Sequence, residues 1–152
     1  MAALFLTFFM YELVYSSKAN KNTDKYAILD ILKTAESTNK KLAITGCLVF
    51  HKTTFVQILE GNKKDIHRLL AKISLDDRHR DVVILHEGEI KKRSFDSWSM
   101  AFHDLNDQNI SQQDTRTFEQ NLIMLSELVD RSSAASFLFW LNVRKQVMGW
   151  LV

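Results

Sequence analysis

The alternation of hydrophobic and polar residues predicts a strand followed by a helix at the start of the chain. Residues 11–15 alternate with the period of a strand, which places Tyr11, Leu13 and Tyr15 on one face. A polar loop follows, and Thr23 is the expected N-cap of a helix. The apolar residues of this helix recur at helical spacing, at Ile28, Ile31, Leu32 and Ala35.

The next part of the chain predicts a hairpin and a second helix. Two largely apolar strands, Leu42 to Phe50 and Phe55 to Glu60, are joined by the short turn HKTT. Apolar residues on both faces indicate that both strands are central in a sheet. Gly61 and Asn62 end the hairpin and cap a helix. Its apolar stripe consists of Ile66, Leu69, Leu70 and Ile73.

Two further strands complete the predicted sheet, at Val82 to His86 and at Trp98 to Phe102. The order β-α-β-β-α-β is typical of the ferredoxin-like split βαβ arrangement, here with a fifth strand added. Both helices then cover one face of the sheet. Residues 115–130 and 134–152 are predicted to be helices that cap the other face. The expected fold class is therefore an α/β sandwich.

Length and composition indicate one domain. The chain has 152 residues, 46% of them hydrophobic, which suffices for one core, and it has no proline and only four glycines to form a linker. We expect residues 1–10 to be an apolar extension, 11–104 the sandwich and 105–152 a helical cap. The extension lacks a basic region and is shorter than the roughly 20 residues needed to span a bilayer. No signal peptide or integral membrane segment is therefore predicted.

Charge and cysteine content narrow the function classes. A net charge of +2 and one short basic run, KKR at 91–93, do not predict nucleic-acid binding. Cys47 is the only cysteine, so no internal disulfide can form, and a reducing, cytoplasmic location is expected. No metal site is predicted from five scattered histidines. An acylphosphatase-like hydrolase is a weak alternative, because Gly61 and Gly88 are isolated and form no phosphate-binding loop.

Two polar residues stand out on the predicted inner face. Alternation places Gln57 on the face of Phe55 and Leu59, beneath the helices, and Tyr15 shares the inner face of a neighbouring strand. An unpaired buried amide costs on the order of 1 to 3 kcal/mol. Each residue alone is more often structural, but together they form a hydrogen-bonding pair. The pair indicates that a polar group lies between the two helices.

Several segments resemble those of the BLUF flavin photoreceptors in order and spacing. They are MYELVYSS at 10–17, the helix end ESTNK, ITGCLVF followed by FVQILEG, then DDRH and FDSWSM. The resemblance covers about residues 10–102. It implies a blue-light sensor that is not an enzyme, with a flavin between the two helices. FAD is the expected cofactor, with FMN as the alternative.

The resemblance also implies roles for particular residues. Tyr15 would be the redox-active tyrosine, and Gln57 the amide that bridges it to the flavin ring. Asn39 would hydrogen-bond the polar edge of the ring. Ile31 and Ile73 match aliphatic positions on either side of the flavin, although periodicity alone makes them ordinary core residues.

Four further positions match the family's pattern. Arg78 and His79 match side chains that approach the ribityl and phosphate tail, although such a pair is usually solvated surface. Trp98 and Met100 match residues associated with relay of the light signal, although a Trp-x-Met pair at strand spacing is also typical of a core. Thr38 stands where relatives often carry a histidine or asparagine.

Output requires that the state of the flavin site bias a second element. We expect an effector protein of unknown identity, or a second subunit in a homo-oligomer, to recognise the fifth strand and the C-terminal helices. The alternative function is a flavin-free ferredoxin-like module that only makes protein contacts. That alternative predicts a colourless protein.

Overall fold

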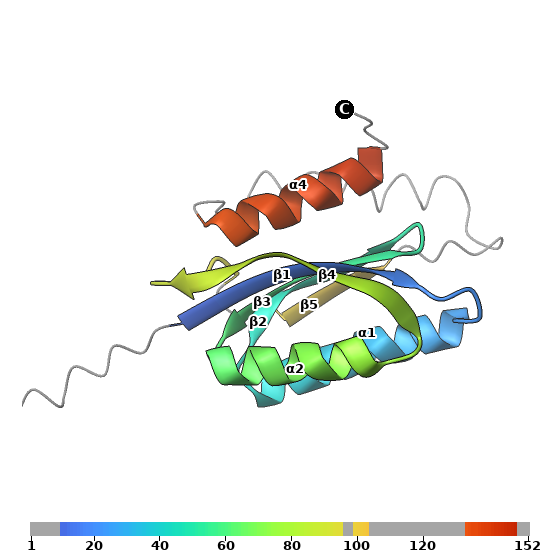
Figure 1. Cartoon of the computed structure of the whole chain (residues 1–152), viewed down its shortest axis with the longest axis horizontal. Coiled ribbons are helices and arrows are strands. Elements are labelled where there is room, and N and C mark those ends of the chain that lie inside the picture. Colours follow the sequence, from blue (N-terminus) through green and yellow to red (C-terminus); the bar gives the residue numbers. More distant parts are fainter. Residues whose placement is uncertain (1–9, 96–98, 104–132, 149–152) are drawn as a thin grey trace, which may run out of the picture.

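Five strands form one sheet in the computed structural model, which describes residues 10–95, 99–103 and 133–148 (Figure 1). The strands are β1 (Met10–Ala19), β2 (Thr45–His51), β3 (Thr54–Gly61), β4 (His79–Ile90) and β5 (Ser99–His103). Their order is β4-β1-β3-β2-β5, and all neighbours are antiparallel except β2 and β5, which are parallel. The order of the first four confirms the α/β class and the ferredoxin-like arrangement.

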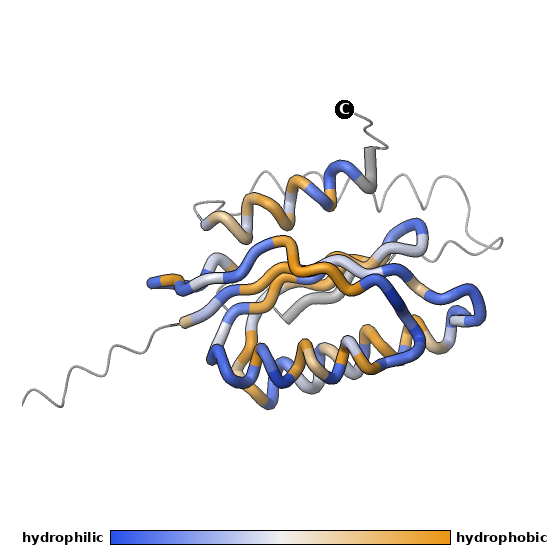
Figure 2. Tube along the Cα trace, viewed as in Figure 1, coloured by the Kyte–Doolittle hydropathy of each residue, from blue (hydrophilic) through white to orange (hydrophobic). Residues whose placement is uncertain are grey.

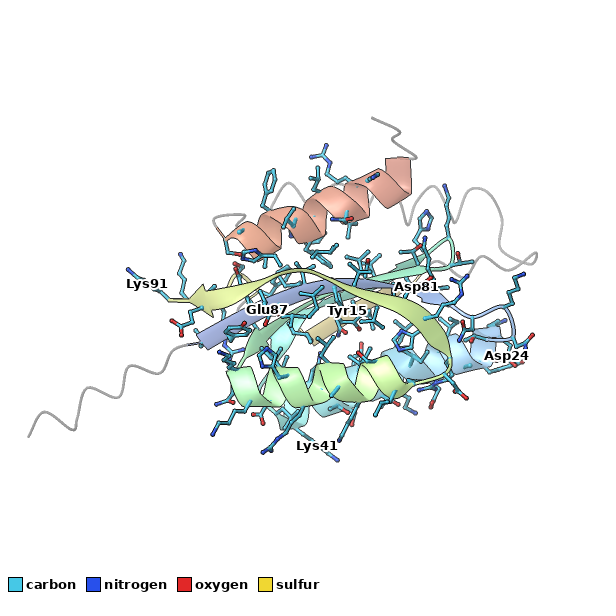
Figure 3. All side chains as sticks on the ribbon, viewed as in Figure 1. Tyr15, Asp24, Lys41, Asp81, Glu87 and Lys91 are labelled. Carbon is cyan, nitrogen blue, oxygen red and sulfur yellow. The ribbon has the colours of Figure 1, made fainter. Side chains whose placement is uncertain are left out.

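The two faces of the sheet belong to different cores, as the strand alternation predicts. Tyr11, Leu13 and Tyr15 pack in a cluster with residues of the second helix, whereas Val14 packs in a cluster with the C-terminal helix. Hydrophobic residues concentrate on the strands and along this helix, and hydrophilic residues concentrate in the loops (Figure 2). Charged side chains such as Lys41 extend from the outer surface (Figure 3).

Helices α1 (Lys25–Lys41) and α2 (Lys63–Leu75) cover the same face of the sheet (Figure 1). Asn62 caps α2 as expected. The expected cap of α1 is wrong by one residue, because Asp24 accepts a hydrogen bond from the Ala27 amide, whereas the Thr23 hydroxyl donates to the Arg78 carbonyl. Thr23, the cap that the local sequence favours, thus uses its hydroxyl for a tertiary contact with Arg78 instead.

Helix α4 (Ala134–Met148) covers the opposite face of the sheet (Figure 1). Its buried residues pack against β1, β2 and β3 through Phe139, Trp140 and Val143. The helix expected at 115–130 lies outside the described residues, as do residues 1–9 and Trp98. No helix in the described ranges is long and apolar enough to cross a membrane.

Several predicted strand limits are wrong. Strand β1 continues to Ala19, through residues 16–19 that were predicted to be loop, because these residues pair with β3 and β4. Leu42 is the C-cap of α1, and Ala43 has a φ of 54°, so the chain turns before β2 begins. Strand β4 extends beyond the expected Val82 to His86 because it pairs along nearly all of β1. The hairpin between β2 and β3 closes through Lys52 and Thr53, with φ values of 47° and 67°.

Candidate functional site

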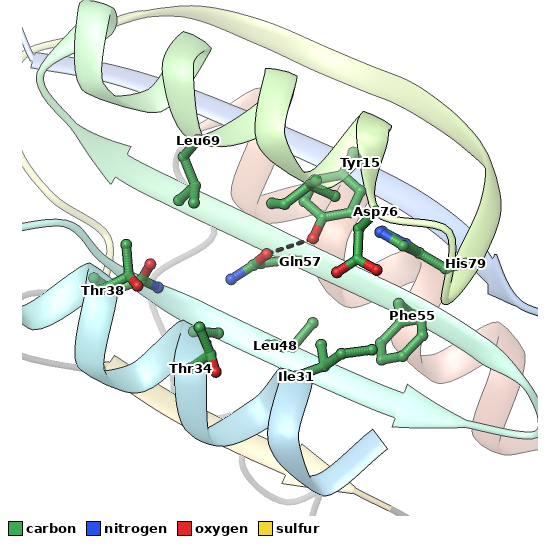
Figure 4. A pocket seen from close by; sticks show the side chains of 13 residues that line it. Tyr15, Ile31, Thr34, Thr38, Leu48, Phe55, Gln57, Leu69, Asp76 and His79 are labelled. Carbon is green, nitrogen blue, oxygen red and sulfur yellow. Dashed lines mark hydrogen bonds between the residues drawn. The ribbon is translucent and has the colours of Figure 1, made fainter. Parts of the chain in front are cut away.

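A cleft between α1 and α2 opens onto the middle of the sheet (Figure 4). Its walls are mostly apolar, with a few polar groups at fixed positions, which is typical of small-molecule and cofactor sites. The lining residues are Tyr15, Ile31, Thr34, Ala35, Thr38, Asn39, Leu48, Phe55, Gln57, Leu69, Ile73, Asp76 and His79.

Tyr15 and Gln57 form a buried hydrogen-bonded pair in this cleft. They are direct partners across β1 and β3, and the Tyr15 hydroxyl donates to Gln57 Oε1 at 2.5 Å. Their exposed fractions are 3% and 2%. Burial raises the pKa of the Tyr15 phenol, so the phenol keeps its proton and acts as the donor. The amide nitrogen of Gln57 points away from Tyr15 (Figure 4).

Asn39 contributes an unsatisfied acceptor to the cleft. It lies near the end of α1 and is 4% exposed, and its Oδ1 atom has no hydrogen-bond partner. Leaving such an acceptor unpaired costs on the order of 1 to 3 kcal/mol. The atom therefore suits a ligand that brings an N–H or O–H donor into the cleft.

Ile31 and Ile73 face the cleft from the two helices, α1 and α2 respectively. Both are partly buried and pack against buried clusters on the sheet. Two aliphatic side chains on opposite walls, with hydrogen-bonding groups between them, suit a planar ring with apolar faces and a polar edge.

His79 and Asp76 line the same cleft beyond Phe55. The His79 Nδ1 atom shares a hydrogen bond of 2.9 Å with the Ser17 hydroxyl, and its ring lies edge-on to Phe55 at 5.7 Å. Arg78 hydrogen bonds hold the pKa of the Asp76 carboxyl below its ordinary value. Strand β4 begins at His79, so the sheet fixes the backbone to which this ring is attached.

Arg78 does not line the cleft. Its guanidinium donates to Asp76, at 2.7 Å for the shortest bond, and to Asp30 at 2.9 Å. It lies instead in a neighbouring polar depression that also contains Lys21 and Arg80. The carboxylates of Asp76 and Asp30 thus hold the Arg78 side chain outside the cleft, and Asp30 belongs to α1.

The expected relay residues are only partly described. Trp98 lies outside the described residues, and Met100 is described through its backbone, which pairs with Cys47 where β5 joins β2. The structure therefore gives no side-chain contact for either residue.

Other polar groups near this part of the sheet were not predicted from the sequence. Asp76 was not expected in the cleft, although its place two residues before Arg78 could have suggested the ion pair. Glu12 and Glu60 are 3% and 0% exposed on the α4 face of β1 and β3. Acidic residues are almost never fully buried without partners, and alternation alone could have placed both on a covered face.

Comparison with known proteins agrees with this geometry. The family model BLUF, described as sensors of blue light using FAD, matches residues 10–101. The chain is 37% identical over 90 residues to photoactivated adenylate cyclase subunit beta from Euglena longa. That match covers 59% of this chain but only 10% of the cyclase subunit.

Solved structures show the same fold. Klebsiella pneumoniae BlrP1 with FMN and cyclic diGMP matches with a TM-score of 0.68 at 27% identity, over 92% of this chain and 35% of that one. The photo-activated state of BlsA matches with a TM-score of 0.60 at 28% identity, over 94% of this chain and 98% of that one.

Proposed function

Since the chain belongs to the BLUF family of blue-light sensors that use FAD, we propose that it senses light through Tyr15 and Gln57 in the cleft between α1 and α2. The observation that carries the proposal is the 2.5 Å hydrogen bond between a buried phenol and a buried amide at the base of that cleft.

The residues of the cleft fit a flavin. The unpaired Asn39 Oδ1 atom can accept from the ring N–H, and Gln57 can bridge Tyr15 to the ring. Ile31 and Ile73 would cover the two faces of the ring. FAD is the proposed cofactor, as the family description indicates, and FMN is the alternative because BlrP1 has been solved with it. Arg78 and His79 would lie toward the polar tail.

The protein's part in the photochemistry is the handling of one electron and one proton. A bound flavin supplies a strong oxidant when it absorbs blue light. With a flavin bound, Tyr15 would give up an electron to that oxidant, and its phenolic proton would move along the hydrogen bond to Gln57. Tyr15 would recover the electron and the proton when the charge returns, and Gln57 would be left rotated or tautomerised, with a donor atom where an acceptor atom had been. No substrate is consumed, so the result is an altered hydrogen-bond network.

We propose that this altered network signals to another protein, either an effector or a second copy of this chain. The family match extends over residues 10–101, and in the photoactivated cyclase subunit the matching segment is a tenth of the chain. Such an arrangement supports a sensor whose output lies elsewhere. Cys47 is the single cysteine, so the chain can form no internal disulfide, which supports the proposed reducing, cytoplasmic location.

The test is an absorption spectrum of protein purified in the dark, recorded before and after blue light. The wild type should show a flavin spectrum that shifts to longer wavelength and then recovers. Tyr15→Phe should retain the flavin and lose the shift. Tyr26→Phe is the matched control, because Tyr26 is 75% exposed on α1, and it should behave as the wild type.

Two outcomes would contradict the proposal. A normal photocycle in Tyr15→Phe would exclude the assigned donor. Protein that stays colourless after reconstitution with FAD or FMN would instead support the flavin-free interaction module.

A further inference from the structure

Strand β3 carries a second functional candidate on the face opposite Gln57. Glu60 lies three residues further along the strand, is 0% exposed, and directs its carboxylate to the α4 side of the sheet. Its two oxygens accept hydrogen bonds from consecutive backbone amides, Ser94 at 2.6 Å and Phe95 at 3.0 Å. The Thr45 hydroxyl donates a third bond at 3.1 Å.

These bonds compensate the cost of burying the acid. Burial raises the pKa of the Glu60 carboxyl, and the amides of Ser94 and Phe95, the Thr45 hydroxyl and the charge of Arg93 act in the opposite direction. Charge-assisted bonds of this kind are about twice as strong as neutral ones. The segment from Arg93 to Phe95 is therefore tied to the end of β3.

The same segment is tied to α4 through Phe95. This side chain is 2% exposed, meets the Phe139 ring at 5.8 Å and 86°, and stacks on the Trp140 ring at 6.0 Å and 25°. Phe139 and Trp140 are fully buried on the inner side of α4. A continuous set of contacts thus runs from Glu60 on β3 through Phe95 to α4.

The partner strand has a matching arrangement. Glu12 lies directly opposite Glu60 across β1 and β3, three residues from Tyr15 on the other face. It is 3% exposed, and its Oε1 atom accepts from the Ala135 amide in the first turn of α4 at 3.4 Å. Both strands that carry the light-sensitive pair therefore hold α4 or its neighbouring segment through a buried carboxylate.

We propose that Glu60 is a positioning residue that couples the Gln57 strand to α4 through the backbone of Ser94 and Phe95. This role rests on the light response proposed above and does not involve the side chains of Trp98 or Met100. Residues 57–60 are one continuous stretch of β3, so in this proposal a backbone shift that accompanies the rearrangement of Gln57 displaces the Glu60 carboxylate. Close-packed aromatic rings shift between discrete arrangements when displaced, because they leave no free volume.

The test compares the wild type, Glu60→Gln and a control by hydrogen exchange in the dark and under blue light. Glu60→Gln replaces one acceptor oxygen with an N–H group that faces a backbone N–H, and it leaves the cleft unchanged. We expect all three proteins to show the spectral shift. The light-induced change in exchange over residues 134–148 should appear in the wild type and be lost in Glu60→Gln. The control, Thr54→Val, removes another side-chain hydrogen bond of β3, the part-buried bond from Lys18, and should retain the change.

Two further measurements separate coupling from stability. Phe95→Leu keeps the amide that Glu60 binds but removes the stacked ring, so it should also lose the light-induced change while keeping the spectral shift. In the wild type with ¹³C-labelled glutamate, the light-minus-dark infrared spectrum should contain a carboxylate band that Glu60→Gln lacks.

The outcomes distinguish this coupling from the function on which it rests. If Glu60→Gln or Phe95→Leu shows the spectral shift and still shows the light-induced change in hydrogen exchange over residues 134–148, the coupling alone is overturned. The same holds if the wild type shows the shift without a carboxylate band. A wild type without any spectral shift would overturn the coupling and the proposed function together.

Discussion

Asn39 gives a prediction whose sign differs between the flavin-free and the flavin-bound protein. In the structure its Oδ1 atom is buried without a partner, so the side chain costs stability unless a ligand pairs with it. Asn39→Leu replaces the amide with an apolar side chain of similar size in the cleft. The substitution should therefore stabilise the flavin-free protein and weaken flavin binding.

The expected magnitudes follow from the burial of that oxygen. Relief of the unpaired acceptor should raise the free energy of unfolding by about 1 to 3 kcal/mol, and the higher helix propensity of leucine adds a few tenths of a kcal/mol. For a chain of this length, each kcal/mol corresponds to a Tm increase of about 2 to 4 °C. Loss of one net hydrogen bond to the flavin, about 0.5 to 1.5 kcal/mol, should raise the Kd roughly 2- to 12-fold.

The assay is thermal unfolding of the flavin-free protein, together with fluorescence titration by FAD. Ser37→Leu is the control, because it lies two residues earlier on the exposed side of α1 and reports only propensity and added surface. It should leave the Kd unchanged. A flavin-free Asn39→Leu protein that is less stable than the wild type, with unchanged flavin affinity, would refute the assignment of Asn39 to the cofactor.

Other predictions concern the scaffold of the site. Gly46→Ala should destabilise the fold by about 4 kcal/mol or more in urea unfolding, because its Cβ would lie 1.9 Å from a β3 carbonyl oxygen at a φ of +150°; a change below about 1 kcal/mol would contradict this. Replacement of Lys52-Thr53 by Asn-Gly should raise the Tm, because both residues have positive φ and Asn-Gly favours that turn; an unchanged or lower Tm would count against it. The pKa of Asp76 is lowered by Arg78, so its contribution to stability is present above the unfolded value of 3.8 and is lost as the pH falls through the folded pKa. Asp76→Asn should remove this part of the pH dependence of the free energy of unfolding. If that pH dependence is unchanged in Asp76→Asn, the ion pair between Asp76 and Arg78 is not its cause.

Much of the fold could be predicted from local pattern. Alternation placed Tyr15 and Gln57 on the face covered by α1 and α2, because a strand has a period of two whatever its neighbours are. The apolar stripes of the two helices placed Ile31 and Ile73 toward the sheet, because a helix has a fixed period of about 3.6 residues. The cap of α1 and the start of β2 could not be predicted, because Thr23 binds a distant carbonyl and Ala43 turns the chain.

The roles proposed for the cleft residues came from the resemblance to the BLUF family. The positions of these residues were determined partly by the sequence and partly by the tertiary structure. The sequence by itself determined which residues face inward, since burial follows the period of each element. Only the tertiary structure decided that Tyr15 opposes Gln57, that Arg78 is held by Asp76 and Asp30, and that Glu60 binds the segment before β5. These contacts join residues far apart in the chain, so they depend on strand register and loop path, which local pattern does not specify.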